Sequence, residues 1–110
     1  MANKIWETAC EVFPNLVKYD CPKIILNNRL SSTGGRCFVR ENKIDLSAKL
    51  INKHGMPFLH EVLPHEIGHQ IDYRINGWPK NNRWHGSQFV VIGAKLGYEF
   101  STYLSPKWFE

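Results

Sequence analysis

An H-E-x-x-H pattern at residues 65–69 constrains this chain more than any other feature. On a helix, residues four apart lie on one face, so His65 and His69 can reach the same metal ion. Imidazole nitrogens bind zinc at about 2.0–2.1 Å. Glu66 would lie beside such an ion, where it can accept a proton from a metal-bound water. The pattern therefore needs a helix around it.

The neighbouring residues favour that helix. Apolar side chains recur at every fourth position: Leu59, Leu63, Ile67, Ile71 and Ile75. Such a stripe would bury the helix against a core. Pro57 suits the first turn, whereas Pro64 is expected to interrupt or kink the helix just ahead of the first histidine. The competing interpretation is an ordinary buried helix with two incidental histidines.

The other segments predict an α+β fold, with a small antiparallel sheet of about three strands packed against helices. Residues 4–13 form an apolar-faced helix that Pro14 ends. Short apolar runs at residues 23–27, 36–40 and 43–46 predict strands, the last two joined by a tight turn.

Two local patterns refine this expectation. In the third predicted strand, Lys43 and Asp45 alternate with apolar residues, so one face of the sheet should be solvated. Ser47 is a suitable N-cap for a short helix over residues 48–53, which Gly55 would end. A last helix begins near His85 and ends at residue 97.

A catalytic zinc site uses three protein ligands and leaves the fourth position to water. His85 stands at the entry of the last helix, on the line of its inward-facing residues, and is favoured as the third ligand. Asp72, three residues past His69, is the rival, and Glu61 and Glu99 are more distant alternatives. If His85 is the ligand, Asp72 is expected to accept a hydrogen bond from a ligand imidazole.

The loop between these two helices mixes aromatic and basic residues. Trp78 and Trp84 are interleaved with Lys80 and Arg83, a mixture that single-strand nucleic-acid binders use to stack on bases and hold phosphates. The net charge of +4 and the pI near 9.1 also favour a polyanionic partner. The alternative is a surface loop that its tryptophans anchor on the core.

Composition sets the broader limits. A chain of 110 residues is expected to form one domain, a monomer by default. It has no apolar run long enough to span a membrane and no signal-peptide pattern at its start. Cys10, Cys21 and Cys37 are odd in number and lack a C-x-x-C pair, which favours reduced thiols in a cytoplasmic protein, with nucleoid association an option.

Three pieces of the chain together resemble the SprT-like domain, the metalloprotease core of the Spartan family. They are residues 33–36 leading into the predicted hairpin, residues 62–69, and the His-Gly-x-x-Phe element at residues 85–89. The resemblance covers about residues 5–97. It differs from bacterial members in a longer stretch between His69 and His85. The Cys-rich zinc ribbon that often follows the domain is absent from residues 1–110.

This resemblance implies a zincin-like fold in which His65, His69 and His85 hold one catalytic Zn²⁺ and Glu66 is the general base. It also implies proteolysis of proteins bound or crosslinked to DNA, often stimulated by the DNA itself, with single-stranded DNA favoured here.

Peptide-bond hydrolysis is thus the leading hypothesis, in which Glu66 activates a zinc-bound water. A donor to the tetrahedral oxyanion is also expected. Tyr73, Arg83 and Arg36 are the candidates, and Asp72 could support a ligand from behind. Two alternatives stay open. One is a non-catalytic nucleic-acid-binding module whose fold is stabilised by zinc, and the other is a regulatory zinc peptidase that does not depend on DNA.

Overall fold

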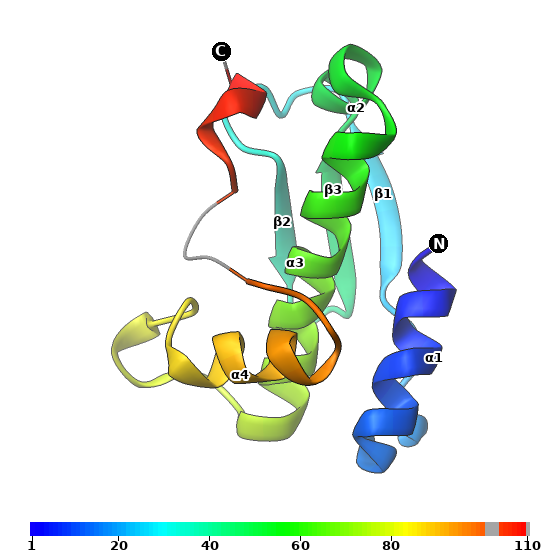
Figure 1. Cartoon of the computed structure of the whole chain (residues 1–110), viewed down its shortest axis with the longest axis vertical. Coiled ribbons are helices and arrows are strands. Elements are labelled where there is room, and N and C mark those ends of the chain that lie inside the picture. Colours follow the sequence, from blue (N-terminus) through cyan, green and yellow to red (C-terminus); the bar gives the residue numbers. More distant parts are fainter. Residues whose placement is uncertain (101–103, 110) are drawn as a thin grey trace.

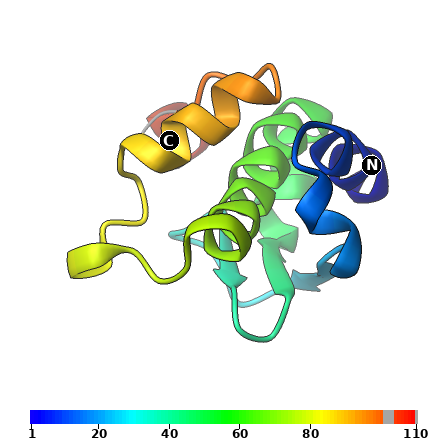
Figure 2. The same ribbon diagram turned by 90° about the horizontal axis from the view of Figure 1, so that it is seen from below.

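The computed structural model describes residues 1–100 and 104–109. Helix α3 (Met56–Asn76) is the central element, and it contacts every other α-helix and two of the three strands. Around it are α1 (Ala2–Val12), α2 (Ala48–His54) and α4 (Ser87–Lys95). The sheet consists of β1 (Lys23–Asn27), β2 (Gly35–Phe38) and β3 (Lys43–Ser47). Helices α1, α3 and α4 lie on one face of this sheet (Figures 1 and 2).

Helix α3 is buried without interruption from Val62 to Asp72. Gly55, at φ +70°, separates it from α2. The helix runs through Pro64 as one element, so the expected interruption is wrong, and the alternative of a kink at this point stays a prediction. Proline removes only one backbone donor, the one that would reach the carbonyl of His60, and His60 is an exposed residue that solvent can reach.

The apolar stripe of α3 is confirmed in its middle and wrong at its end. Leu63, Ile67 and Ile71 are at most 3% exposed, but Ile75 is 40% exposed. With 3.6 residues per turn, a four-residue step advances about 400°, so such a row drifts about 40° at each step. By Ile75 the row has left the core.

The sheet is mixed rather than antiparallel, which corrects the prediction. Its order is β1-β3-β2; β3 runs antiparallel to β2 and parallel to β1. The predicted hairpin joins β2 to β3 through residues 39–42, with Asn42 at φ +52°. The longer connection from β1 carries the chain past the central position, so β3 returns between its neighbours and is the most buried strand.

The predicted solvated face of β3 is also wrong at Asp45, which is 7% exposed. Because β3 is central, side chains from both flanking strands cover this carboxylate. Asn27 Nδ2 donates to Asp45 Oδ2 at 3.1 Å, and the Arg36 guanidinium donates to it at 3.3 Å. A buried charge is tolerated when it is paired and hydrogen-bonded in this way.

The short helix after β3 forms as expected. The fully buried Ser47 hydroxyl accepts the Leu50 N–H at 3.1 Å and donates to the Leu30 carbonyl at 2.7 Å. This cap satisfies a helix donor and fixes the preceding loop at the same time. Among the described residues, no helix is both long and apolar enough to cross a lipid bilayer.

Candidate metal centre

Three histidines converge at the crossing of α3 and α4. His65 and His69 lie one turn apart on α3, and His85 lies two residues before α4 begins. His85 Nε2 is 3.2 Å from His65 Nε2 and 3.1 Å from His69 Nε2. Two nitrogens on one tetrahedral zinc would be about 3.3–3.4 Å apart, given bonds of about 2.0–2.1 Å. The three-histidine group therefore could hold a metal ion.

Burial keeps these imidazoles neutral. It lowers the pKa of His65 to about 4, assisted by the neighbouring His85 and opposed by Glu61. It lowers the pKa of His69 to about 2, with the other two histidines adding repulsion. The pKa of His85 is lowered for the same reason. A neutral imidazole is the form that binds a metal, so the chemistry of the donor set fits a divalent ion.

Glu66 is 6% exposed and lines the same cavity as the three histidines. Desolvation raises the pKa of its carboxyl to about 8. Gly35 of β2 lets the sheet approach closely, because a Cβ at that position would lie 3.1 Å from Glu66 Cγ and 3.0 Å from the Asp45 carbonyl oxygen. An ionisable group whose pKa lies near neutral pH can both accept and release a proton.

Asp72 does not belong to this cluster. Its carboxylate accepts a hydrogen bond from Asn76 Nδ2 at 2.8 Å, one turn further along α3. His69 Nδ1 is buried and has no hydrogen-bond partner among the described residues. His69 Nδ1 therefore does not make the expected hydrogen bond to Asp72, which stays a prediction for the other two histidines.

The cavity over the site, about 280 Å³, has one polar and one apolar wall. Residues 32–35, which lead into β2, form the first wall. Leu104 and Phe109 form the second, and they belong to residues 104–109, called here the C-terminal segment. Sequence reasoning missed this segment, because no short-range pattern relates it to the H-E-x-x-H helix.

Glu61 holds the C-terminal segment in place rather than serving the metal cluster. Its Oε2 accepts the Ser105 N–H at 2.9 Å and the Trp108 Nε1–H at 2.6 Å. Trp108 is 7% exposed and packs edge-on against Phe58 of α3, with ring centroids 5.5 Å apart. Its carbonyl oxygen lies 2.8 Å from His54 Nε2. These contacts fix one wall of the cavity to α2 and α3.

The candidate oxyanion donors have their described contacts elsewhere. Arg36 binds Asp45 on the sheet, and Tyr73 packs edge-on against Trp78 at 6.5 Å. Arg83 lines a different hollow, of about 470 Å³, beside Asp72. None of these three lines the cavity that contains Glu66.

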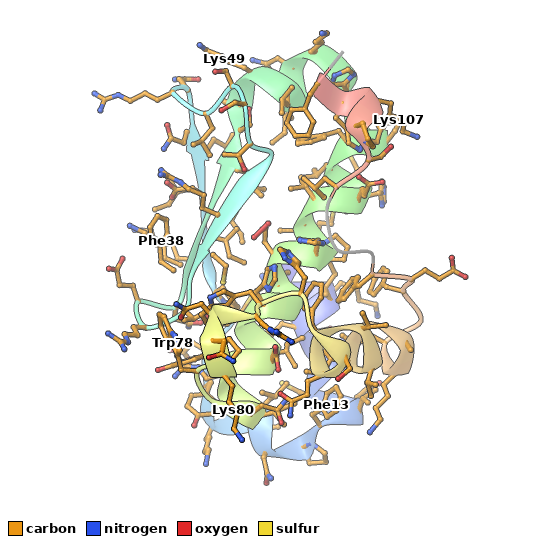
Figure 3. The ribbon with its side chains drawn as sticks, turned by 90° about the vertical axis from the view of Figure 1, so that its left-hand side faces the viewer. Phe13, Phe38, Lys49, Trp78, Lys80 and Lys107 are labelled. Carbon is orange, nitrogen blue, oxygen red and sulfur yellow. The ribbon has the colours of Figure 1, made fainter. Side chains whose placement is uncertain are left out.

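The loop that carries the tryptophans and basic residues lies beside the site. Figure 3 shows two of its residues, Trp78 and Lys80. Trp84 packs edge-on against His69 at 6.2 Å and against Trp78 at 4.9 Å. Trp78 remains 49% exposed, and the Arg40 guanidinium lies 4.6 Å from its ring centroid. The loop is thus anchored through Trp84 and presents Trp78 with exposed Lys80 at the surface.

The fold and the site define a small α+β protein built around a three-histidine group that could hold a metal. The chain belongs to the SprT-like family, whose family model matches residues 4–107. It is 32% identical over 97 residues to Protein SprT of Vibrio parahaemolyticus, covering 84% of this chain and 58% of the relative. It is 31% identical over 88 residues to Protein SprT of Serratia proteamaculans, covering 76% and 51%.

The chain spans about half the length of the curated relatives it matches. No solved structure is matched. Family membership and the three-histidine group together indicate a domain of the metalloprotease type.

Proposed function

We propose that this chain is a zinc-dependent peptidase that hydrolyses peptide bonds of proteins associated with DNA. The observation that carries the proposal is the meeting of three imidazole Nε2 atoms with a buried carboxylate in one cavity. A structural zinc site would use four protein ligands and would have no need of an acid–base group beside it.

In this proposal His65, His69 and His85 hold the zinc through their Nε2 atoms. Bound zinc would supply Lewis acidity in the cavity. Glu66 accepts a proton from the attacking water and delivers it to the departing amine. Burial raises the pKa of the Glu66 carboxyl to about 8 in the metal-free protein, and a bound zinc ion would lower it, which favours the carboxylate form that accepts a proton.

DNA enters the proposal through the surface beside the cavity. Trp78 offers an exposed ring for stacking, and exposed Lys80 and Arg83 offer charge for phosphates. Arg40, stacked on Trp78, extends the basic surface toward the hairpin. A nucleic acid held here would bring an associated protein close to Glu66.

The contact of Trp84 with His69 supports a second candidate, a zinc peptidase that acts without DNA. If the tryptophans serve only to anchor the loop on the metal centre, the loop needs no nucleic acid. The two candidates share the same chemistry and differ in their dependence on DNA.

The test is cleavage of a DNA-binding protein by the zinc-loaded chain, with and without single-stranded DNA, beside a Glu66→Gln control. Cleavage that needs both Glu66 and DNA supports the leading proposal. DNA-independent cleavage selects the second candidate. Zinc and DNA binding without any cleavage would replace both with the non-catalytic binding module.

A further inference from the structure

The orientation of His69 is set in an unusual way. Metal-binding imidazoles normally donate their second ring N–H to a carboxylate or carbonyl, which fixes the ring. Here His69 Nδ1 is buried without such a partner among the described residues, and Asp72 is bound to Asn76. What lies against the ring instead is Phe89, stacked at a centroid distance of 4.3 Å and an interplanar angle of 11°.

Phe89 touches all three histidines. Besides stacking on His69, its ring meets His65 edge-on at 5.1 Å and His85 edge-on at 5.5 Å. It is fully buried at the start of α4. The position of the Phe89 ring therefore constrains the orientation of all three histidine rings.

Phe89 is itself held from behind by Phe100. The two rings stack at 4.8 Å with an interplanar angle of 21°, and Phe100 also meets His65 edge-on at 6.0 Å. Tyr98 continues the stack on the far side at 5.7 Å. After α4 the chain turns back across α3, and this return places Phe100 against both helices (Figure 1).

Two glycines form the slot for Phe100. A Cβ at Gly68 of α3 would lie 2.4 Å from Phe100 Cε2, and a Cβ at Gly93 of α4 would lie 2.4 Å from Phe100 Cδ2. Glycine inside a helix costs about 1 kcal/mol relative to alanine. Neither glycine has positive φ, so the space for Phe100 is the physical reason for both.

We propose that Phe100 is a positioning residue for the metal centre. Phe100 lies between Gly68 and Gly93 and holds Phe89 against His69. This packing fixes the orientation of the His69 ring, as a hydrogen bond to Nδ1 does in other sites. This inference rests on the proposed metal site and adds to it a residue 15 positions beyond the last ligand, outside the H-E-x-x-H and His-Gly elements.

The test is the zinc affinity of the folded chain, measured by competition with a chelator, for the wild type, Phe100→Leu, Phe100→Tyr and Gly93→Ala. Phe100→Leu should weaken zinc binding by about tenfold or more, at the lower end of what loss of an outer support costs other sites. Phe100→Tyr keeps the stacked ring and should bind as the wild type does. Gly93→Ala should weaken binding as Phe100→Leu does, although alanine favours the helix.

Phe13→Leu is the matched control, because Phe13 packs on the same core from the end of α1 and is not among the rings around the histidines. It should lower the melting temperature of the metal-free protein and leave zinc affinity unchanged. Measurements well below every melting temperature keep the variants folded, so that lost stability is not mistaken for lost affinity.

Equal zinc affinity in Phe100→Leu and the wild type would overturn the positioning role while leaving the proposed metal site standing. A wild type that binds no zinc would refute the proposed function itself. If Phe100→Leu does not fold, Gly93→Ala decides, because it displaces the ring without removing it. Unchanged affinity in that variant would also overturn the role.

Discussion

Replacing Glu61 by alanine should make the C-terminal segment open more often, while most of the fold stays intact. Glu61 Oε2 accepts hydrogen bonds from the Ser105 N–H and the Trp108 Nε1–H, at 2.9 and 2.6 Å. A hydrogen bond to a charged group contributes about 1.5–3 kcal/mol. Glu61 is only half-buried, so hydrogen bonds to water replace part of this free energy. We expect the two contacts together to lose about 2–3 kcal/mol of stability.

The loss should fall mainly on local opening of the segment, which can detach without disturbing the sheet. Hydrogen exchange of the Ser105 amide, followed by NMR, measures that opening directly. A loss of about 2–3 kcal/mol corresponds to exchange about 30- to 140-fold faster. Amides of β3 should change far less, since they belong to the central strand.

Glu41→Ala is the matched control. Its side chain is 64% exposed, and within the described part of the chain its ion pair is with Lys43 at 3.4 Å. Removal of such a surface pair should change stability by less than about 0.5 kcal/mol. Unchanged exchange at Ser105 in Glu61→Ala would refute the reasoning, as would an equal acceleration at Ser105 and throughout β3.

Three further outcomes are expected. Ser47→Ala removes a helix cap and leaves the buried Leu30 carbonyl without its donor, so urea denaturation should give a loss of about 2–3 kcal/mol; a loss below 1 kcal/mol would contradict this. Burial raises the pKa of Glu66 from its ordinary 4.5 to about 8, so the folded metal-free protein holds a proton that the unfolded chain has released, and its stability falls as pH rises through that window. Metal-free Glu66→Gln should therefore gain stability over metal-free wild type between pH 4.5 and 8 in urea titrations, and a pH-independent difference would argue against the shift. Desolvation, with the neighbouring Glu66 charge, raises the pKa of Cys37 far above its ordinary 9.0, so alkylation at pH 8 followed by mass spectrometry should modify the other two cysteines first; early modification of Cys37 would contradict this shift.

The sequence was most informative where short-range spacing carries the chemistry. The four-residue spacing of His65 and His69 predicts one helix face, and the structure has both on that face. The place of His85 at the entry of the last helix favours it as the third member, and its Nε2 lies within 3.2 Å of the Nε2 atoms of both other histidines. Local propensity also located the strands and the Ser47 cap.

What the sequence could not give depends on long-range arrangement. The direction of β1 relative to β3 is decided by a connection that crosses the sheet, and no alternation pattern encodes it. Asp45 is polar in sequence but buried by its neighbours on both sides. Asp72 has the right spacing to support a ligand, yet Asn76 takes its carboxylate.

The same limit explains the two missed parts of the site. Phe100 and the C-terminal segment reach the histidines only after the chain has turned back over α3. Gly68 and Gly93 were the only local signs, because a glycine inside a helix indicates close approach by another element. Neither glycine indicates which residue approaches.

Zinc affinity of the wild type, His85→Ala and Asp72→Ala tests the central claim most directly. The wild type should bind one zinc per chain, and Asp72→Ala should bind it equally, since Asp72 lies outside the cluster. His85→Ala removes one of three ligands and should lose most of that affinity. Zinc held as tightly by His85→Ala as by the wild type, or lost in Asp72→Ala alone, would contradict the three-histidine site.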